Sequence, residues 1–111
     1  MAAVSRPISI GLNLSSGTAV TVYTVPTGYY AKWNLMYLFN NSGSTKSISV
    51  YWRDSSAATN IYVHNGTIAA GSYVRQDGGA YVVLEEGDEI RMTAVAASTM
   101  SAINTFELFR K

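Results

Sequence analysis

The fold is decided by the stretch from Tyr29 to Asp54, which reads YYAKWNLMYLFNNSGSTKSISVYWRD. Its two halves, 29–40 and 45–54, are rich in the aromatic and β-branched side chains that favour strands. In the second half the apolar side chains recur at every other position, as a strand requires, at Ile48, Val50 and Trp52. The Asn-Asn-Ser-Gly-Ser link between the halves is made of turn-forming residues. The stretch therefore predicts two antiparallel strands joined as a hairpin.

The first half of this stretch has apolar side chains on both of its faces. Strict alternation puts one set on one face, at Trp33, Leu35, Tyr37 and Phe39. The other face then carries Met36 and Leu38. This predicts a central strand that is covered on both sides, or a strand with one face turned to a subunit neighbour. The pattern does not select which face is directed inward.

Further strands are predicted on both sides of the hairpin, because short runs rich in Val, Ile, Thr, Tyr and Phe alternate with turn signals. The predicted segments are Ile8–Leu14, Ala19–Val25, Asn60–His64, Tyr73–Gln76, Ala80–Leu84, Glu89–Ala96 and Ala102–Arg110. The expected fold is all-β: one domain over residues 1–111, an antiparallel two-sheet sandwich of about eight strands with a jelly-roll-like order. Residues 1–7 are expected to form an extended N-terminal arm. The expected core joins the Ile and Leu side chains of the first strand with Val50, Trp52, Val83 and Ile90.

Composition excludes several classes of function. Charged residues make up 14% of the chain and the net charge is +1, so neither nucleic acid nor an anionic membrane is an expected partner. With no cysteine, disulfides and cysteine-based metal sites are excluded. The sequence contains no long apolar run of the transmembrane kind and no signal-peptide pattern at its start. Because so few residues are charged, electrostatic repulsion between copies of the chain is weak. Weak repulsion favours a protein that works while it is bound to partners.

The residues that could carry chemistry are few. His64 is the only histidine, and it is expected at a hairpin rim beside Asn65 and Gly66. The run from Glu85 to Glu89 resembles a calcium loop, but its carboxylates are crowded rather than spaced as ligands, so a solvated turn is expected. A glycosidase-like carboxylate pair at Asp54 and Glu107 is not indicated by any further feature. We therefore expect no catalytic residues, no metal site, no cofactor and no enzymatic activity.

The aromatic side chains are the richest functional signal, since the chain has eight Tyr, two Trp and three Phe. Tyrosine is common in sheets, in protein–protein interfaces and in sugar-binding rows. A glycan-binding row is conceivable at Tyr51, Tyr62, Tyr73 and Tyr81. The residues expected at an interface are Arg6, Tyr37, Tyr51, Tyr62 and Tyr73.

Three turn motifs together resemble a known group of proteins. The first reads Val-Pro-Thr-Gly-Tyr at 25–29, the second Asn-Asn-Ser-Gly-Ser at 40–44, and the third Leu-Glu-Glu-Gly-Asp-Glu-Ile at 84–90. Strands separated by these motifs, from about Val20 to Ala94, are similar to small β-sandwich structural proteins of tailed bacteriophages. That group includes capsid decoration (cement) subunits and tail, neck or fibre-associated subunits.

The resemblance implies a non-enzymatic virion protein, made in the host cytoplasm, whose activity is binding alone. The leading expectation is a capsid decoration subunit that forms a homo-oligomer, with a trimer favoured, and binds the major capsid protein or another virion protein. A tail, neck or fibre-associated subunit is the first alternative, and a glycan-binding receptor-recognition module is the second. A small hydrolase built on His64 ranks below these.

Overall fold

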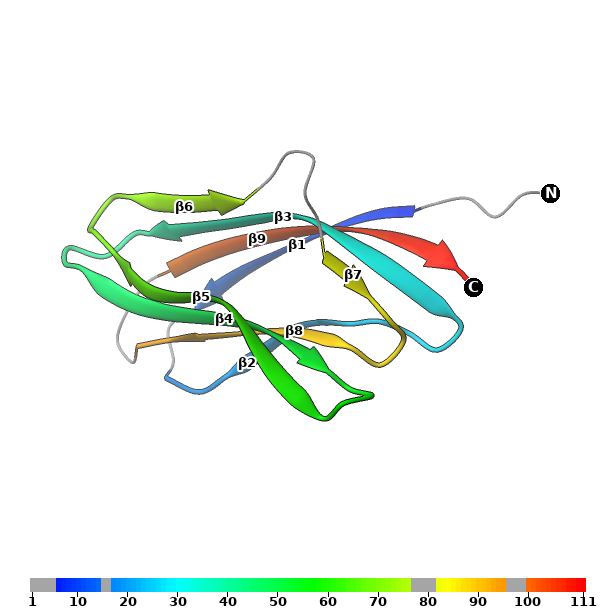
Figure 1. Cartoon of the computed structure of the whole chain (residues 1–111). Helices are drawn as coiled ribbons and strands as arrows, with labels where there is room; N and C mark the ends of the chain where they lie inside the picture. Colours follow the sequence, from blue (N-terminus) through cyan, green and yellow to red (C-terminus); the bar gives the residue numbers. More distant parts are fainter. Residues whose placement is uncertain (1–5, 15–16, 77–81, 96–99) are drawn as a thin grey trace.

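The computed structural model describes residues 6–14, 17–76, 82–95 and 100–111, and every regular element in these ranges is a strand. The strands are β1 (Arg6–Leu14), β2 (Val20–Thr24), β3 (Tyr29–Asn40), β4 (Lys46–Asp54), β5 (Thr59–Ile68), β6 (Tyr73–Gln76), β7 (Val82–Leu84), β8 (Glu89–Ala94) and β9 (Met100–Arg110). They form two layers, which Figure 1 shows one above the other. Within the described residues, no helix has the length and apolar character needed to cross a membrane.

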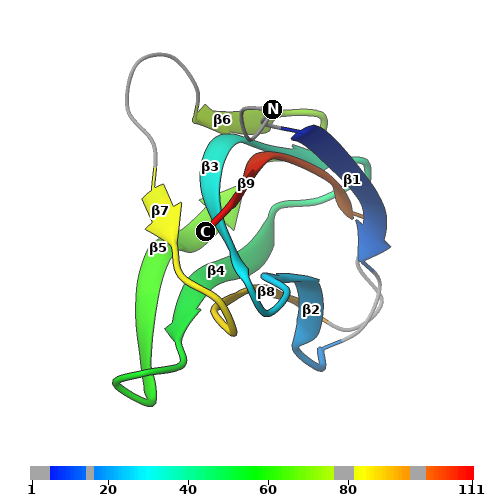
Figure 2. The same ribbon diagram turned by 90° about the vertical axis from the view of Figure 1, so that its right-hand side faces the viewer.

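The strand order is that of a jelly roll. The five-stranded sheet runs β1-β9-β3-β6, with β7 also paired to β3, and the four-stranded sheet runs β2-β8-β4-β5; all pairs are antiparallel. β6 and β7 lie along the same edge of the long strand β3, where an eight-stranded jelly roll has one strand (Figure 2). The all-β, two-sheet sandwich predicted from the sequence is confirmed, with nine strands in the described residues.

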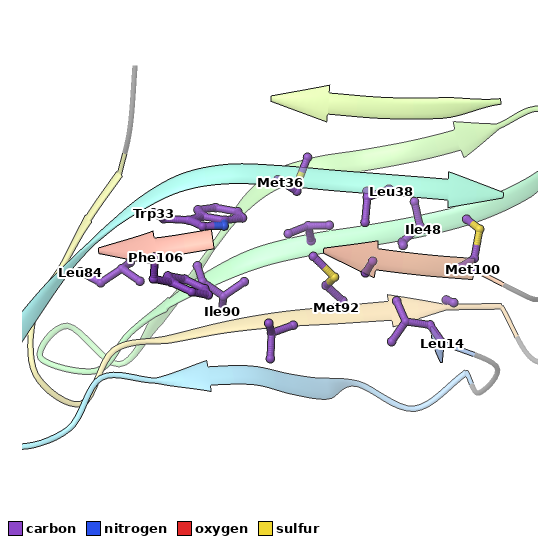
Figure 3. Packing of buried hydrophobic residues seen from close by; sticks show 14 of the residues in the cluster. Leu14, Trp33, Met36, Leu38, Ile48, Leu84, Ile90, Met92, Met100 and Phe106 are labelled. Carbon is purple, nitrogen blue, oxygen red and sulfur yellow. The ribbon is translucent and has the colours of Figure 1, made fainter. Parts of the chain in front are cut away.

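The core fills the space between the sheets (Figure 3). Its fully buried members come from both layers and include Leu38, Ile48, Val50, Ile90, Met92, Met100 and Phe106. Each such side chain contributes about 1.5–3 kcal/mol by leaving water. The inward row of β1 is as predicted, although only Leu14 is fully covered and the others are partly buried, because β1 is an edge strand. Val83 is the exception among the predicted core residues, since it points outward between Val82 and Leu84 and is exposed.

A β-bulge in β3 overturns the predicted faces of this strand. The register with β9 shifts between Trp33 and Leu35, so Asn34 is an extra residue. The extra residue reverses the alternation. Trp33 is therefore buried on the same side as Met36, whereas strict alternation predicted it beside Leu35.

The buried indole of Trp33 has a buried polar partner. Its Nε1–H donates a 3.0 Å hydrogen bond to Oδ1 of Asn104 on β9. The amide nitrogen of Asn104 points at Sδ of Met92 in the opposite sheet, 4.0 Å away. A fully buried asparagine is tolerated in this core because its oxygen receives a donor that would otherwise be unpaired.

The predicted hairpin at Asn65 and Gly66 is wrong. β5 continues through both residues, which pair with Ser49 and Ile48 of β4. Ser49 Oγ donates a 2.9 Å hydrogen bond to Oδ1 of Asn65, so the pairing with β4 satisfies a residue that favours turns in isolation. The β4–β5 hairpin instead turns at residues 55–58, where Ala58 has a positive φ of 53°.

The expected N-terminal arm can be compared with the structure at two residues. Arg6 and Pro7 belong to β1, opposite Leu108 and Glu107 of β9, so at these positions the chain is strand. The remainder of the expected arm, residues 1–5, lies outside the described residues.

Candidate functional site

Four of the five predicted interface residues form two tyrosine pairs on opposite outward faces of the sandwich. Tyr37 of β3 and Tyr73 of β6 stack with ring centroids 5.5 Å apart, on the five-stranded sheet. Tyr51 of β4 and Tyr62 of β5 lie 5.4 Å apart, with their rings tilted by 59°, on the four-stranded sheet. The fold thus separates the predicted residues into two sites.

The first pair belongs to an apolar surface that we call the aromatic face. Its residues are Leu35, Tyr37, Phe39, Tyr73 and Ile103. They point outward because the residues alternating with them, such as Leu38, are buried in the core. The register explains their contact: Phe39 lies opposite Tyr73, and Tyr37 lies opposite Ile103. Tyr73 is 57% exposed and Ile103 is 42% exposed. An outward sheet face normally carries polar side chains, so this one is unusual.

Aromatic side chains continue on the same outward side toward the C-terminal end of β9. Tyr30 and Phe109 stack there with centroids 5.0 Å apart, and Nζ of Lys32 lies 5.2 Å from the centroid of Phe109. Val83 of β7 lies opposite Lys32 and is 44% exposed. Glu107 is the register partner of Lys32 on β9. This end of the sheet therefore combines aromatic surface with charges of both signs.

Arg6, the fifth predicted residue, lies away from both tyrosine pairs. It shares the inward side of β1 with Ile8 by alternation, at the exposed end of the strand. Near this end, the hydrogen bond from Arg110 to the hydroxyl of Tyr29, 3.3 Å long, lowers the pKa of Tyr29, and the charge of Arg6 adds to the effect. Burial raises the pKa of Tyr23, and Arg6 opposes that rise. Arg6 thus lies near the tyrosines at the end of the sandwich.

The outward face of the four-stranded sheet is polar and internally paired. Nε of Arg91 donates a 2.7 Å hydrogen bond to Oε1 of Glu89. This bond, together with a contact to the hydroxyl of Tyr51, raises the pKa of Arg91. Nη1 of Arg53 donates to Oδ1 of Asn60 at 3.0 Å. The polar groups of this face are hydrogen-bonded to one another, so the face is stable when it is exposed to solvent.

The acidic turn differs from the expected solvated turn in one residue. Gly87 has a φ of +85°, as a turn glycine should, but Asp88 is buried. Its carboxylate accepts four hydrogen bonds: from Trp52 Nε1, from the backbone N–H and the hydroxyl of Ser55, and from the N–H of Glu85, at 2.9–3.1 Å. An oxygen pair surrounded by donors is unsuited to a cation. Among the described residues, no group of three or more His, Cys, Asp or Glu side chains is placed to hold a metal ion.

The structure separates the residues that a hydrolase would need. His64 lies in the interior of β5, opposite Val50, rather than at a hairpin rim. In the part of the chain that the structure describes, its Nε2 is the one buried side-chain nitrogen or oxygen atom without a hydrogen-bond partner. Asp54 accepts hydrogen bonds from Ser56 and Ala57 in the β4–β5 turn, whereas Glu107 lies on β9 of the other sheet.

The predicted glycan-binding row is not assembled. Tyr51 and Tyr62 lie on one sheet and Tyr73 on the other, facing away from them. Tyr81 lies outside the described residues. The residue that sequence reasoning missed is Ile103, because its outward position on β9 is set by the register with β3.

No family model matches the sequence, and no curated protein matches it. Solved structures do match the fold. A subunit of the Bacillus endospore appendages, described as disulfide-linked pili, is 17% identical, with a TM-score of 0.59 over 97% of this chain and 88% of that one. A chain of the acid-stable capsid of the Helicobacter pylori bacteriophage KHP30 is 13% identical, with a TM-score of 0.57 over 96% and 87%.

A third similar structure is the NLP core of Drosophila, described in connection with pentamer formation and histone binding. It is 16% identical, with a TM-score of 0.55 over 88% of this chain and 95% of that one. At such identities the likeness establishes the fold, a jelly-roll β-sandwich that these assemblies share. It does not by itself assign a function to this chain.

Proposed function

We propose that this chain is a non-enzymatic structural subunit of a bacteriophage virion, and that it decorates the capsid. It forms a homo-oligomer, with a trimer favoured, and binds the assembled shell through contacts with the major capsid protein or another virion protein. Its mechanism is binding alone. A subunit that binds the intact shell and not its dissociated parts stabilises the shell by mass action.

The observation that carries the proposal is the aromatic face. The sheet exposes Tyr73 and Ile103 on its outward side. Binding of another protein over this side is favourable, because apolar area then leaves water and the free energy falls. The tyrosine rings also add contact area at a low cost in side-chain entropy. The low charge of the chain, 14% charged residues and a net charge of +1, is consistent with assembly.

The capsid comparison supports the same proposal. The alignment with the KHP30 capsid chain covers nearly all of both chains, so a capsid component of similar length has this fold. The pilus comparison favours the first alternative, a tail, neck or fibre-associated subunit, because it places the fold in an extended assembly. The native mass divides these possibilities: three copies favour decoration or a fibre-associated subunit, whereas six or twelve favour a neck or tail subunit.

The proposal is tested with shells assembled in the absence of this protein. The purified chain is added, and co-sedimentation and the temperature at which the shells open are measured. We expect saturable binding and a higher opening temperature. Shells that already carry the protein are the control, because their sites are filled and they should take up little more. A chain that neither sediments with deficient shells nor changes their opening temperature would contradict decoration.

One observation supports glycan binding as a second candidate function, the exposed ring of Tyr62. It is 58% exposed on the polar face, with Asn60 and Arg53 beside it on the same side. Titration with host polysaccharides, read by calorimetry with Tyr62→Ala as the comparison, tests this second function. Binding that Tyr62→Ala removes would support it, and the absence of heat from every polysaccharide would count against it.

A further inference from the structure

We propose that the aromatic face is covered by a second copy of this same chain. The inference rests on the proposed function, because it assigns a surface to the self-association proposed there. Its occupant is argued from exposure, charge and size.

The outward side of the five-stranded sheet carries half of the exposed large apolar side chains of the described residues. Among the described residues, six large apolar side chains are substantially exposed. Three of them, Tyr73, Ile103 and Val83, lie on the outward side of the five-stranded sheet. On the outward side of the other sheet Tyr62 stands among hydrogen-bonded polar partners. The first face therefore gains more from being covered.

The charges on this side suit a copy of the chain. The outward side of the five-stranded sheet carries Lys32 and Arg75 as cations and Glu107 as an anion. A strongly charged partner is recognised by a surface whose charges are all of the opposite sign. This face carries both signs, so it does not favour such a partner. A second copy brings the same mixture, and with a net charge of +1 per chain the long-range repulsion between copies is small.

The dimensions of the molecule are sufficient for such a contact. A stable interface buries about 800 Å² on each partner. The principal extents of the chain are 51, 27 and 20 Å, and the sheet faces lie along the long direction of the molecule (Figure 1). A contact centred on Tyr37 and Tyr73 therefore has room for an interface of this size.

The fold supplies a matched pair of variants for the test. Tyr73 and Tyr62 are 57% and 58% exposed. Both lie on edge strands, and each packs against one further tyrosine, at 5.5 Å and 5.4 Å. They differ in the face on which they lie. Tyr73→Glu and Tyr62→Glu therefore introduce the same charge at equivalent depths on opposite sides.

The experiment measures the mass of the full chain in solution by light scattering and native mass spectrometry, over a range of concentrations and without shells. We expect the unsubstituted chain and Tyr62→Glu to form the same oligomer. Tyr73→Glu should weaken self-association by at least about tenfold. Circular dichroism and thermal unfolding identify a variant that has lost its fold, and in that case Tyr73→Ser replaces it.

Each outcome decides the inference. A monomeric unsubstituted chain, an oligomer that Tyr73→Glu leaves intact, or an oligomer that Tyr62→Glu alone dissociates would overturn it. A monomer that still binds deficient shells through Tyr73 would overturn self-association and keep the decoration proposal. An oligomer that depends on Tyr73 but ignores shells would do the reverse.

Discussion

The indole N–H of Trp52 donates a 3.1 Å hydrogen bond to Oδ2 of Asp88, which joins β4 to the turn between β7 and β8. Asp88 is 1% exposed and accepts further bonds from Ser55 and Glu85. One buried carboxylate thus holds together the β7–β8 turn, strand β4 and the start of the β4–β5 turn.

Replacing this carboxylate should destabilise the fold strongly. Asp88→Ala leaves buried donors on Trp52, Ser55 and Glu85 without an acceptor, and we expect a loss of about 3 kcal/mol or more. Asp88→Asn keeps the shape and one oxygen, so its loss should be smaller. Urea unfolding followed by tryptophan fluorescence measures both. Glu85→Ala, which removes an exposed carboxylate from the same turn, is the control and should change little; equal effects of Asp88→Ala and Glu85→Ala would refute this account.

The hydrogen bond between Trp33 and Asn104 predicts a coupled pair of substitutions. Asn104→Leu leaves the indole N–H of Trp33 unsatisfied in the core, at a cost of about 1–3 kcal/mol. Trp33→Phe removes that donor, so the double variant should be less destabilised than the two single losses summed. A double-mutant cycle by chemical unfolding measures the coupling, which we expect at about 0.5–3 kcal/mol. Strict additivity would show that the bond contributes no coupling.

Two turn glycines have nearly the same backbone angle φ but different surroundings. Replacing each with alanine therefore distinguishes the cost of backbone strain from the cost of steric crowding by neighbouring atoms. Gly28 and Gly87 have φ of +87° and +85°. A Cβ at Gly28 meets nothing within 4 Å, whereas a Cβ at Gly87 lies 3.0 Å from Oγ of Ser55. Gly28→Ala should cost about 1–2 kcal/mol through its backbone alone. Gly87→Ala should cost more, because it also pushes Ser55 away from Asp88. Differences in thermal unfolding temperature test the order, and the reverse order would contradict the geometry.

The ion pair between Lys111 and Glu86 predicts that the folding stability depends slightly on pH and salt. Nζ of Lys111 donates a 2.9 Å hydrogen bond to Glu86, which lowers the pKa of Glu86 and raises that of Lys111. Because the Glu86 pKa is lower in the folded state, the pair stabilises the fold above the unfolded pKa of Glu86. That contribution is lost as the pH falls through the folded pKa.

Glu86→Gln should therefore reduce stability slightly at pH 7 and have almost no effect at a pH low enough to protonate the Glu86 carboxyl group in both the folded and the unfolded state. Since both groups are exposed, 1 M salt should suppress the difference. Urea unfolding at the two pH values checks this. A difference that grows at low pH has the wrong sign for this mechanism.

Because Nε2 of His64 has no hydrogen-bond partner, we expect that an apolar residue can replace His64 without loss of folding stability. Replacing a buried polar group that lacks a partner with an apolar side chain removes a desolvation cost. His64→Leu should fold and be as stable as the unsubstituted chain or more so, with the same self-association. Val50→Ala, opposite His64 on β4, is the contrasting variant and should lose stability through a core cavity. A strongly destabilised His64→Leu would mean that the imidazole has a partner in solution.

Several features of this protein follow from local sequence alone. Period-two alternation and clusters of Asn, Ser, Gly and Pro are local signals, so β3 and β6 begin and end where the sequence predicts. The sandwich class follows from the number and spacing of such strands. The pattern failed at Asn65 and Gly66, where a long strand ladder outweighs the turn preference of two residues.

What the chain determined by itself is a strand-rich, weakly charged, two-layered fold, because alternation, turn chemistry and composition act within a few residues. Tertiary structure alone decided which side chains share a surface. The bulge at Asn34 reverses the faces of β3, and cross-strand register places Tyr73 on Tyr37 and away from Tyr62. It also decided that Asp88 is buried, because three of the four donors to its carboxylate come from β4 and the following turn, more than thirty positions away in sequence. Such contacts depend on how distant strands meet, which no local pattern contains.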